Sequence, residues 1–308
     1  MIKYTILDFV CRFEEQAVLA GFKGNIIRGA LGNSLRKICC PIKRMECDQC
    51  ILAANCIYFF IFESKQIKRP HLSPSTPHPF VLEPPDADKI RYESGDEFIF
   101  RLVLLNDAIK WIPYIVYATI NMGEMGIGKG RKNGFGRFKL KSVKQDGIEI
   151  YQSDSKELIP VKRDKYLDLH KSTTPTNKLQ VDFLTPYRVK FRNSLATTFD
   201  FSILIRAALR RISNLENTFS GKEPDVDYRG LVKRSQDVQM VCEEKRWVDL
   251  TRFSFRQKSK MKLGGLVGRA IYEGELTEFY PLLKYIEIVH VGKQTSFGFG
   301  KIKVTVLE

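Results

Sequence analysis

Four cysteines near the N-terminus have the spacing of a metal-binding knuckle. Cys40, Cys47, Cys50 and Cys56 are separated by six, two and five residues. A Cys-x-x-Cys pair can place two thiolates on one small ion, and two further thiolates complete the tetrahedral set that zinc prefers. Four protein ligands leave no position for a catalytic water, so the pattern predicts a structural zinc. An iron–sulfur cluster, or reduced thiols packed under an apolar lid, would also be compatible with this spacing.

Two glycine loops repeat along the chain. Gly128-Lys129 and Gly292-Lys293 are each followed, five residues after the lysine, by Gly-Phe-Gly, and the two copies are 164 residues apart. Glycine permits positive φ, and successive backbone N–H groups with lysine neighbours can form a concave anion site. A flexible turn between a helix and a strand is the alternative. The repeat predicts phosphate contacts by residues of both loops, namely Lys129, Arg131, Gly292, Lys293, Gly298 and Gly300.

A third basic stretch, residues 229–262, interleaves ten basic and four acidic residues with aromatic ones. Basic side chains position phosphates, and aromatic rings stack on unpaired bases. Arg252 and Arg256 flank Ser254 with the two-residue period of one strand face. We therefore predict that both arginines contact nucleic acid. A solvated strand face with ordinary core aromatics would explain the same pattern.

The composition supports a nucleic-acid partner. The chain has 308 residues, 50 Lys plus Arg against 35 Asp plus Glu, and a formal net charge of +15. A protein this basic most often binds a polyanion. The sequence has no basic amphipathic helix pattern that would favour a membrane surface instead. The longest nearly apolar run, 51–62, is too short to cross a bilayer, and no signal-peptide core stands at the N-terminus. We therefore expect a cytoplasmic protein with reduced or metal-bound cysteines.

The elements that must position these groups alternate between strand and helix patterns. Each half runs strand, helix, two strands, helix, glycine loop, strand, and Ile27–Leu31 has a weaker echo in Ile205–Leu209. This order predicts an α+β fold of two tandem ferredoxin-like β-α-β-β-α-β domains. The predicted parts are a first domain at 1–145 with a Cys-rich insertion at 39–56, a linker region at 146–178, and a second domain at 179–308 whose glycine-rich loop is 292–300. The predicted strands are 3–13, 97–105, 137–143, 179–189, 238–255, 260–272 and 301–307, and the predicted helices are 25–39, 108–122, 199–215 and 275–285.

The motifs in this order resemble a known family. In the second half they are His290–Gly300, Leu184–Lys190, Arg210-Arg211, Arg252–Gln257 and Met261–Gly268, and in the first half Arg28–Gly32, the cysteine cluster and Pro77–Phe80. They are similar to motifs of the RAMP superfamily of CRISPR proteins. The best resemblance is to the endoribonuclease that cleaves CRISPR repeats in precursor transcripts, in a subgroup with an N-terminal cysteine cluster.

The resemblance implies metal-independent cleavage of repeat RNA, with 2′,3′-cyclic phosphate and 5′-OH products. Such chemistry needs a base for the 2′-OH, an acid for the leaving oxygen, and positive charge at the phosphorus. Many members of the family carry a histidine in or just after the first helix, whereas this chain has none before His71 and has Asn33 in mid-helix. The predicted catalytic residues are therefore His290, the remaining histidine closest to the presumed RNA, and Lys37 and Arg36 of the first helix. The alternative for His290 is a structural histidine that is hydrogen-bonded at the end of a strand or helix.

Two other functions fit the sequence. The missing first-helix histidine favours a non-catalytic RAMP subunit that holds CRISPR RNA in an effector complex, whereas the whole-chain order of motifs favours the nuclease. An unrelated zinc-containing RNA-binding protein is the other alternative. The resemblance implies CRISPR repeat RNA as the partner, with other effector subunits and a second copy of the chain as further candidates.

Overall fold

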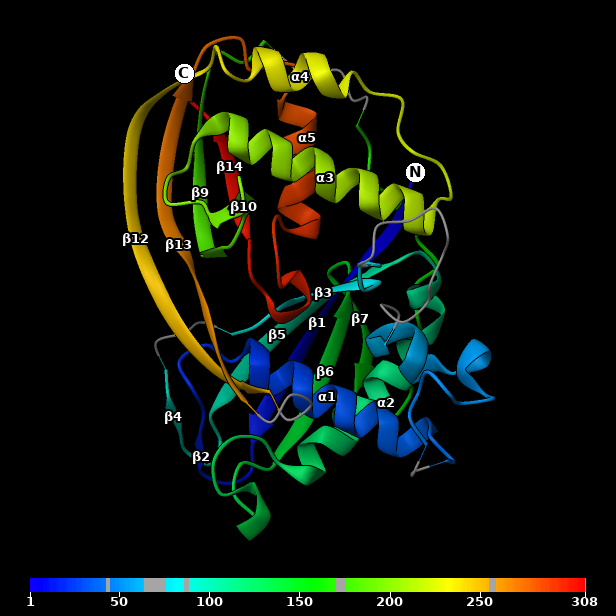
Figure 1. The fold of residues 1–308 in the computed structure, drawn as a ribbon. Helices are drawn as coiled ribbons and strands as arrows, with labels where there is room; N and C mark the ends of the chain where they lie inside the picture. Colours follow the sequence, from blue (N-terminus) through cyan, green and yellow to red (C-terminus); the bar gives the residue numbers. More distant parts are fainter. Residues whose placement is uncertain (43–44, 64–75, 86–88, 170–174, 255–258, 308) are drawn as a thin grey trace. The chain divides into compact units, whose positions relative to one another are not determined.

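The computed structural model describes residues 1–42, 45–63, 76–85, 89–169, 175–254 and 259–307, with the side chains of 251–262 outside that description. The predicted RNA contact Arg256 also lies outside the described residues. The chain forms two compact units, Ile2–Tyr166 and Leu167–Glu308, and Met1 belongs to the second of them (Figure 1). Among the described residues, no helix has the length and hydropathy to cross a membrane.

The first unit is a sheet in the strand order β3-β5-β1-β6-β7, in which every neighbouring pair is antiparallel. Its main elements are β1 (Lys3–Phe13), α1 (Gly24–Cys39), β3 (Phe80–Glu83), β5 (Glu97–Leu105), α2 (Ile112–Met125), β6 (Phe138–Gln145) and β7 (Ile148–Gln152). The smaller elements are β2 (Ala17–Val18), β4 (Arg91–Tyr92), β8 (Lys165–Tyr166) and short helical turns at Ala53–Asn55, Phe59–Glu63, Asn106–Trp111 and Arg131–Asn133.

The core of the first unit follows from the alternation along β1. Alternate residues from Thr5 to Phe13 are buried, whereas most of those between them are partly exposed. Phe9 stacks on Phe100 of the neighbouring strand with ring centroids 4.7 Å apart. Cys11 shares this buried face, where burial raises the pKa of its thiol well above the ordinary value. The alternation gives one buried and one partly solvated face, as in an antiparallel sheet covered by helices.

The second unit repeats the arrangement. Its strand order is β12-β13-β9-β14. Its main elements are β9 (Lys178–Tyr187), α3 (Phe201–Phe219), β12 (Gln239–Ser254), β13 (Ser259–Glu273), α5 (Tyr280–Val289) and β14 (Ile302–Val306), and the smaller ones are β10 (Lys190–Phe191), β11 (Ser194–Leu195), α4 (Tyr228–Arg234) and a turn at Thr295–Phe297. In both units the first strand lies between the third and the fourth, which is the ferredoxin-like order. The predicted tandem ferredoxin-like fold is confirmed.

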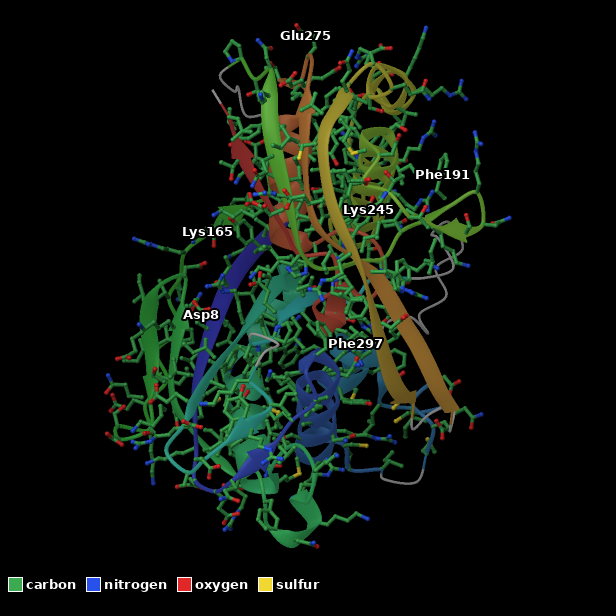
Figure 2. The ribbon with its side chains drawn as sticks, turned by 90° about the vertical axis from the view of Figure 1, so that its left-hand side faces the viewer. Asp8, Lys165, Phe191, Lys245, Glu275 and Phe297 are labelled. Atoms are coloured by element: carbon green, nitrogen blue, oxygen red, sulfur yellow. The ribbon has the colours of Figure 1, made fainter. Side chains whose placement is uncertain are left out.

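The strands β12 and β13 are much longer than the rest of their sheet. β13 pairs with β9 only over Leu266–Glu273. Beyond that pairing, Val248–Ser254 and Ser259–Gly265 continue as a two-stranded ribbon (Figure 2). We call this pair of segments the ribbon, and Arg252 lies on it, opposite Met261.

Part of the predicted linker region, 146–178, is sheet. β7 pairs with β6, β8 pairs with β1, and the boundary between the two units falls after Tyr166. Ile150 and Tyr151 are buried within an otherwise charged segment, and two buried residues are too short a pattern to predict a strand.

Two predicted helices begin later than expected. α2 begins at Ile112 and α5 at Tyr280, and each has proline as its second residue. Proline lacks the N–H that the first turn of a helix leaves unbonded, so it favours a helix start. The prolines therefore mark the two starts.

Candidate nucleic-acid interface

The two glycine loops have the same backbone conformation. Five positions in each loop have positive φ, and the two sets correspond one to one across the offset of 164 residues. They are Gly126, Gly128, Gly130, Gly134 and Gly136 in the first loop and His290, Gly292, Gln294, Gly298 and Gly300 in the second. We call 126–136 loop 1 and 290–300 loop 2. The repeat seen in the sequence is therefore a repeat of three-dimensional structure.

Loop 2 is tied to the end of β9 by backbone hydrogen bonds. The Lys293 N–H donates to the Arg188 carbonyl (2.9 Å), and the Gly300 N–H donates to the Pro186 carbonyl (3.1 Å). A Cβ on Gly300 would lie 1.8 Å from the Val291 carbonyl oxygen, and one on Gly292 would lie 2.7 Å from that of Arg188. Both positions therefore require glycine, whose absent side chain lets the loop close against its neighbours.

Four cations gather beside loop 2. Partial burial lowers the pKa of Lys293, and the charges of Lys190, Arg188 and Arg210 lower it further. These four residues come from loop 2, β10, the end of β9 and α3, and we call them the cation cluster. Like charges held together in this way favour an anionic ligand, because an anion relieves their mutual repulsion.

The cation cluster also has a fixed connection to the ribbon. The Arg188 guanidinium donates from Nη1 to the Gly264 carbonyl (2.6 Å). Trp247 packs over the same glycine, where a Cβ would lie 2.7 Å from its ring, and 40% of the tryptophan surface is exposed. Arg188 thus holds loop 2 through its backbone and the ribbon through its side chain.

The sequence predicts Lys293 as a phosphate contact but does not predict Arg188, Lys190 or Arg210. Their only signal was that they lie in the motifs that carry the family resemblance. In loop 1, Lys129 and Arg131 are exposed, as a phosphate contact requires.

His290 is completely buried and lies in a backbone conformation that is unusual for a side-chain-bearing residue (φ 58°, ψ 163°). Its Nδ1 lies 3.1 Å from the Phe299 carbonyl oxygen and must carry the proton, because a carbonyl only accepts. The preceding carbonyl, of Val289, accepts from Arg211 (3.0 Å). The ring thus joins the start of loop 2 to its end. With no exposed surface, it could reach a phosphate only if the loop rearranged.

The predicted charge-stabilising residues Arg36 and Lys37 lie in the last turn of α1. Lys37 is exposed, whereas the Arg36 guanidinium lies over the Tyr58 ring, 5.6 Å from its centroid. Of the two, Lys37 is the more exposed side chain.

A histidine does contact α1, although from another segment. His78 Nε2 lies 3.1 Å from the Arg28 guanidinium of α1, and its Nδ1 lies 3.1 Å from the Ile61 carbonyl oxygen. Because that carbonyl only accepts, Nδ1 carries the proton and Nε2 accepts from Arg28. His78 is 8% exposed, so it is a packed residue that anchors α1.

The five clustered cysteines are half-buried thiols around the end of α1. Burial and the neighbouring Cys56 raise the pKa of Cys39 to about 11. Burial also raises the pKa of Cys47, which the nearby Arg36 opposes. In the described part of the chain, no three Cys, His, Asp or Glu side chains converge as a metal site would require. The thiols as they lie do not form the tetrahedral set, so the zinc site stays a prediction.

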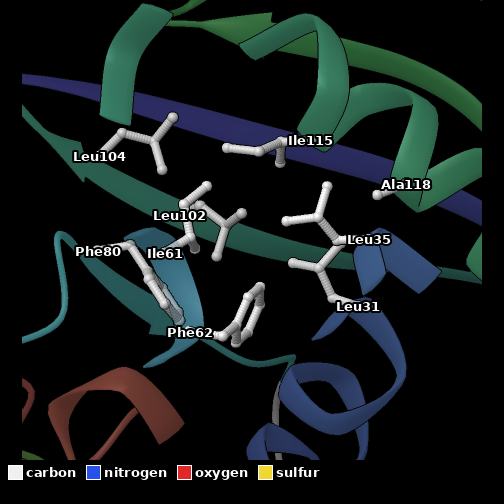
Figure 3. A pocket seen from close by; sticks show the side chains of 9 residues that line it. All are labelled: Leu31, Leu35, Ile61, Phe62, Phe80, Leu102, Leu104, Ile115 and Ala118. Atoms are coloured by element: carbon white, nitrogen blue, oxygen red, sulfur yellow. The ribbon is translucent and has the colours of Figure 1, made fainter. Parts of the chain in front are cut away.

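An apolar cavity lies beneath α1 and α2 of the first unit (Figure 3). It is lined by Leu31, Leu35, Ile61, Phe62, Phe80, Leu102, Leu104, Ile115 and Ala118. Its volume of about 10 Å³ is at the lower limit for one water molecule, which would find no polar partner there. This cavity is a packing gap in the core.

Comparison with known proteins decides the family. Residues 181–302 match the family model of the CRISPR-associated endoribonuclease Cas6, and residues 2–163 match a model described as an N-terminal domain, AF_1859_N. The AF_1859_N match covers more than half of the chain, so the chain belongs to that family, and its second unit carries a Cas6 domain. Loop 2 and the cation cluster lie within the Cas6 match, and loop 1 and the cysteine cluster lie within the N-terminal match.

Other proteins are similar to this chain over its whole length. An uncharacterized protein of Archaeoglobus fulgidus is 25% identical over 299 residues, which cover 93% of this chain and 92% of that protein. The structure of a Thermus thermophilus Cas6 covers 99% of both chains with a TM-score of 0.57 and 14% identity. A partial Cas6-RT-Cas1–Cas2 complex matches with a TM-score of 0.59 and 15% identity, and this chain spans 46% of the matched chain. At these identities the two solved structures show a shared fold.

Proposed function

We propose that this protein binds the CRISPR repeat of a precursor transcript and cleaves it without a divalent metal. The observation that carries the proposal is the cation cluster beside loop 2, inside the segment that matches the Cas6 model. A solved Cas6 product complex with a TM-score of 0.56 and 14% identity to this chain supports the same function.

Binding rests on phosphate contacts from several elements. Arg188, Lys190, Arg210 and Lys293 provide the cation cluster, and a bound phosphate would offset the repulsion that lowers the pKa of Lys293. Further proposed contacts are Lys129 and Arg131 of loop 1, Arg252 of the ribbon, and Arg256. Gly292, Gly298 and Gly300 stay predicted contacts, although the N–H groups of Gly298 and Gly300 already donate to the Thr295 and Pro186 carbonyls, so RNA would reach these N–H groups only if the loop opened.

The proposed reaction is an internal transesterification. The 2′-oxygen forms a bond to the adjacent phosphorus while the bond from phosphorus to the 5′-oxygen breaks, which leaves a 2′,3′-cyclic phosphate and a 5′-OH. A base takes the 2′ proton, an acid protonates the leaving oxygen, and a cation stabilises the charge that develops on the phosphorane. Exposed Lys37 is our candidate for the cation, with Arg36 beside it, and His290 remains the predicted acid or base.

One observation favours a second function. In α1, where many members of the family have a histidine, this chain has exposed Asn33, and His290 is buried. A non-catalytic RAMP subunit that holds CRISPR RNA with other effector subunits would need neither group as an acid or base. It would still use the cation cluster.

The test is incubation of the full chain with the repeat RNA of its own CRISPR array, in the presence of EDTA. The nuclease proposal predicts cleavage at one position and a 3′ end that acid treatment opens to a monophosphate. Replacement of the 2′-OH by hydrogen at that position should abolish cleavage and leave binding nearly unchanged. Binding without cleavage would support the second function, and cleavage that requires magnesium would contradict the proposed chemistry.

A further inference from the structure

Loop 1 has the backbone of loop 2 but presents different side chains. Phe135 is 48% exposed, whereas Phe299, its counterpart in loop 2, is completely buried. Lys129, Arg131 and Lys132 are exposed, and within the part of the chain that the structure describes they take part in no ion pair. Loop 1 therefore combines an exposed aromatic ring with three uncompensated positive charges.

The Phe135 ring has a defined seat. A Cβ on Gly130 would lie 3.1 Å from Cδ2 of the ring, so the glycine makes room for the phenyl group to lie against the loop. Gly130 and Gly134 both have left-handed backbones and flank the short helical turn that carries Arg131 and Lys132. An aromatic ring held in this way loses little conformational freedom when a ligand packs on it.

Loop 1 is rich in positive charge, and an acid that approaches it is already paired. Glu15 approaches Gly134 and forms an ion pair with Arg137 at the end of the loop. From Met125 to Gln145 the sequence has no acidic residue. A negative ligand at the loop therefore meets Lys129, Arg131 and Lys132, and the charge of Glu15 is offset by Arg137.

We propose that loop 1 is a second RNA-binding site that takes an unpaired nucleotide. The base would stack on Phe135, and the flanking phosphates would contact Lys129, Arg131 and Lys132. An unpaired strand fits because duplex RNA hides the faces of its bases, whereas single-stranded RNA offers them to aromatic side chains. This inference rests on the proposed RNA-binding function and adds a site in the first unit that prefers single strands.

The test compares Phe135→Ala and Phe135→Tyr in the full chain, with oligouridine and a blunt RNA duplex of the same length as probes. Loss of one stacked base should weaken oligouridine binding about 5-fold or more for the alanine variant, and the tyrosine variant should bind like the parent. Duplex affinity should stay within about 2-fold, since only phosphates are contacted. The triple variant Lys129→Ala/Arg131→Ala/Lys132→Ala should lower the slope of log K against log salt by roughly 0.7 per lost contact.

The double variant Lys162→Ala/Arg163→Ala is the control, because it removes two exposed charges from the same unit outside the loop. It should retain the oligouridine affinity and most of the salt slope. The inference would be overturned if Phe135→Ala left the affinity for oligouridine unchanged. It would also be overturned if Phe135→Ala weakened the binding of oligouridine and of the duplex equally. A parent protein that does not bind its repeat RNA at all would instead refute the proposed function.

Discussion

Gly126 and His290 occupy equivalent positions in the two loops and share one backbone conformation, with φ and ψ of 70° and 160° in the first and 58° and 163° in the second. This region of φ/ψ space is nearly restricted to glycine, and another residue there costs roughly 1–3 kcal/mol. The buried ring of His290 and its hydrogen bond to the Phe299 carbonyl offset that cost. Where loop 1 has a glycine, loop 2 thus has a histidine whose side chain joins the two ends of the loop.

His290→Gly and His290→Ala separate a positioning role from an acid–base role. Both remove the ring, but glycine also removes the backbone strain, so the glycine variant should unfold at the higher temperature of the two. If His290 positions loop 2, both variants should weaken RNA binding as well as cleavage. If His290 transfers a proton, the affinity for RNA should stay unchanged while single-turnover cleavage slows roughly 10²-fold or more. The acid or alkaline limb of the pH–rate profile should then also disappear.

The cation cluster should make RNA binding strongly dependent on salt. Lys190→Ala, Arg210→Ala and Lys293→Ala should each lower the slope of log K against log salt by roughly 0.7, because each removes one phosphate contact to a single strand. Binding isotherms of repeat RNA at four or five salt concentrations measure the slope. A set of three unchanged slopes would mean that these side chains face solvent in the complex.

Lys293 should couple RNA binding to protons. Burial and three neighbouring cations lower its pKa below the ordinary value of 10.5, and a bound phosphate should raise it again. RNA binding should therefore take up protons at alkaline pH. As the pH rises, the affinity for RNA should begin to decline at a lower pH than it would if Lys293 had the ordinary pKa of a lysine. Calorimetry in buffers of different ionisation enthalpy measures the uptake, and Lys293→Arg should abolish it. In the free protein the unfolded state binds the extra proton, so the stability contributed by this group rises with pH.

Lys37 should matter for cleavage more than for binding. Lys37→Ala should slow single-turnover cleavage by roughly 10²-fold at saturating RNA, because it removes charge that stabilises the transition state. Arg36→Ala should slow it too, although the contact of Arg36 with Tyr58 also makes it a packing residue. Lys162→Ala is the control for a lost exposed charge. A Lys37→Ala protein that cleaves at the parent rate would remove this residue from the mechanism.

The cysteine cluster predicts about one zinc per chain. Elemental analysis of purified protein measures it, and Cys47→Ser and Cys50→Ser should each lower the zinc content and the melting temperature. Cys11→Ser is the contrasting variant, since Cys11 is a core residue of β1 and its loss should leave the zinc content unchanged. A metal-free preparation that melts at the temperature of the untreated protein would rule out a structural metal.

Some features of this protein could be predicted from the sequence because they depend on local patterns. The alternation of β1 and β5 predicted both strands with the observed ends, since side chains of a strand alternate between two faces. The spacing of the glycines predicted the repeated loop, because a positive φ is a property of one residue and its neighbours. The order of strands and helices then specified the two ferredoxin-like units, since few arrangements connect them in that order.

The tertiary structure decided which of the many basic residues lie together. Arg188, Lys190 and Arg210 approach Lys293 only because β9, β10, α3 and loop 2 meet, and sequence separation conveys nothing about that meeting. It also decided that His290 is buried and Lys37 exposed, because burial depends on everything packed around a side chain. The sequence by itself determined the loops and the order of elements, through local backbone preference and periodicity. Packing between distant segments determined which charges and rings those loops expose.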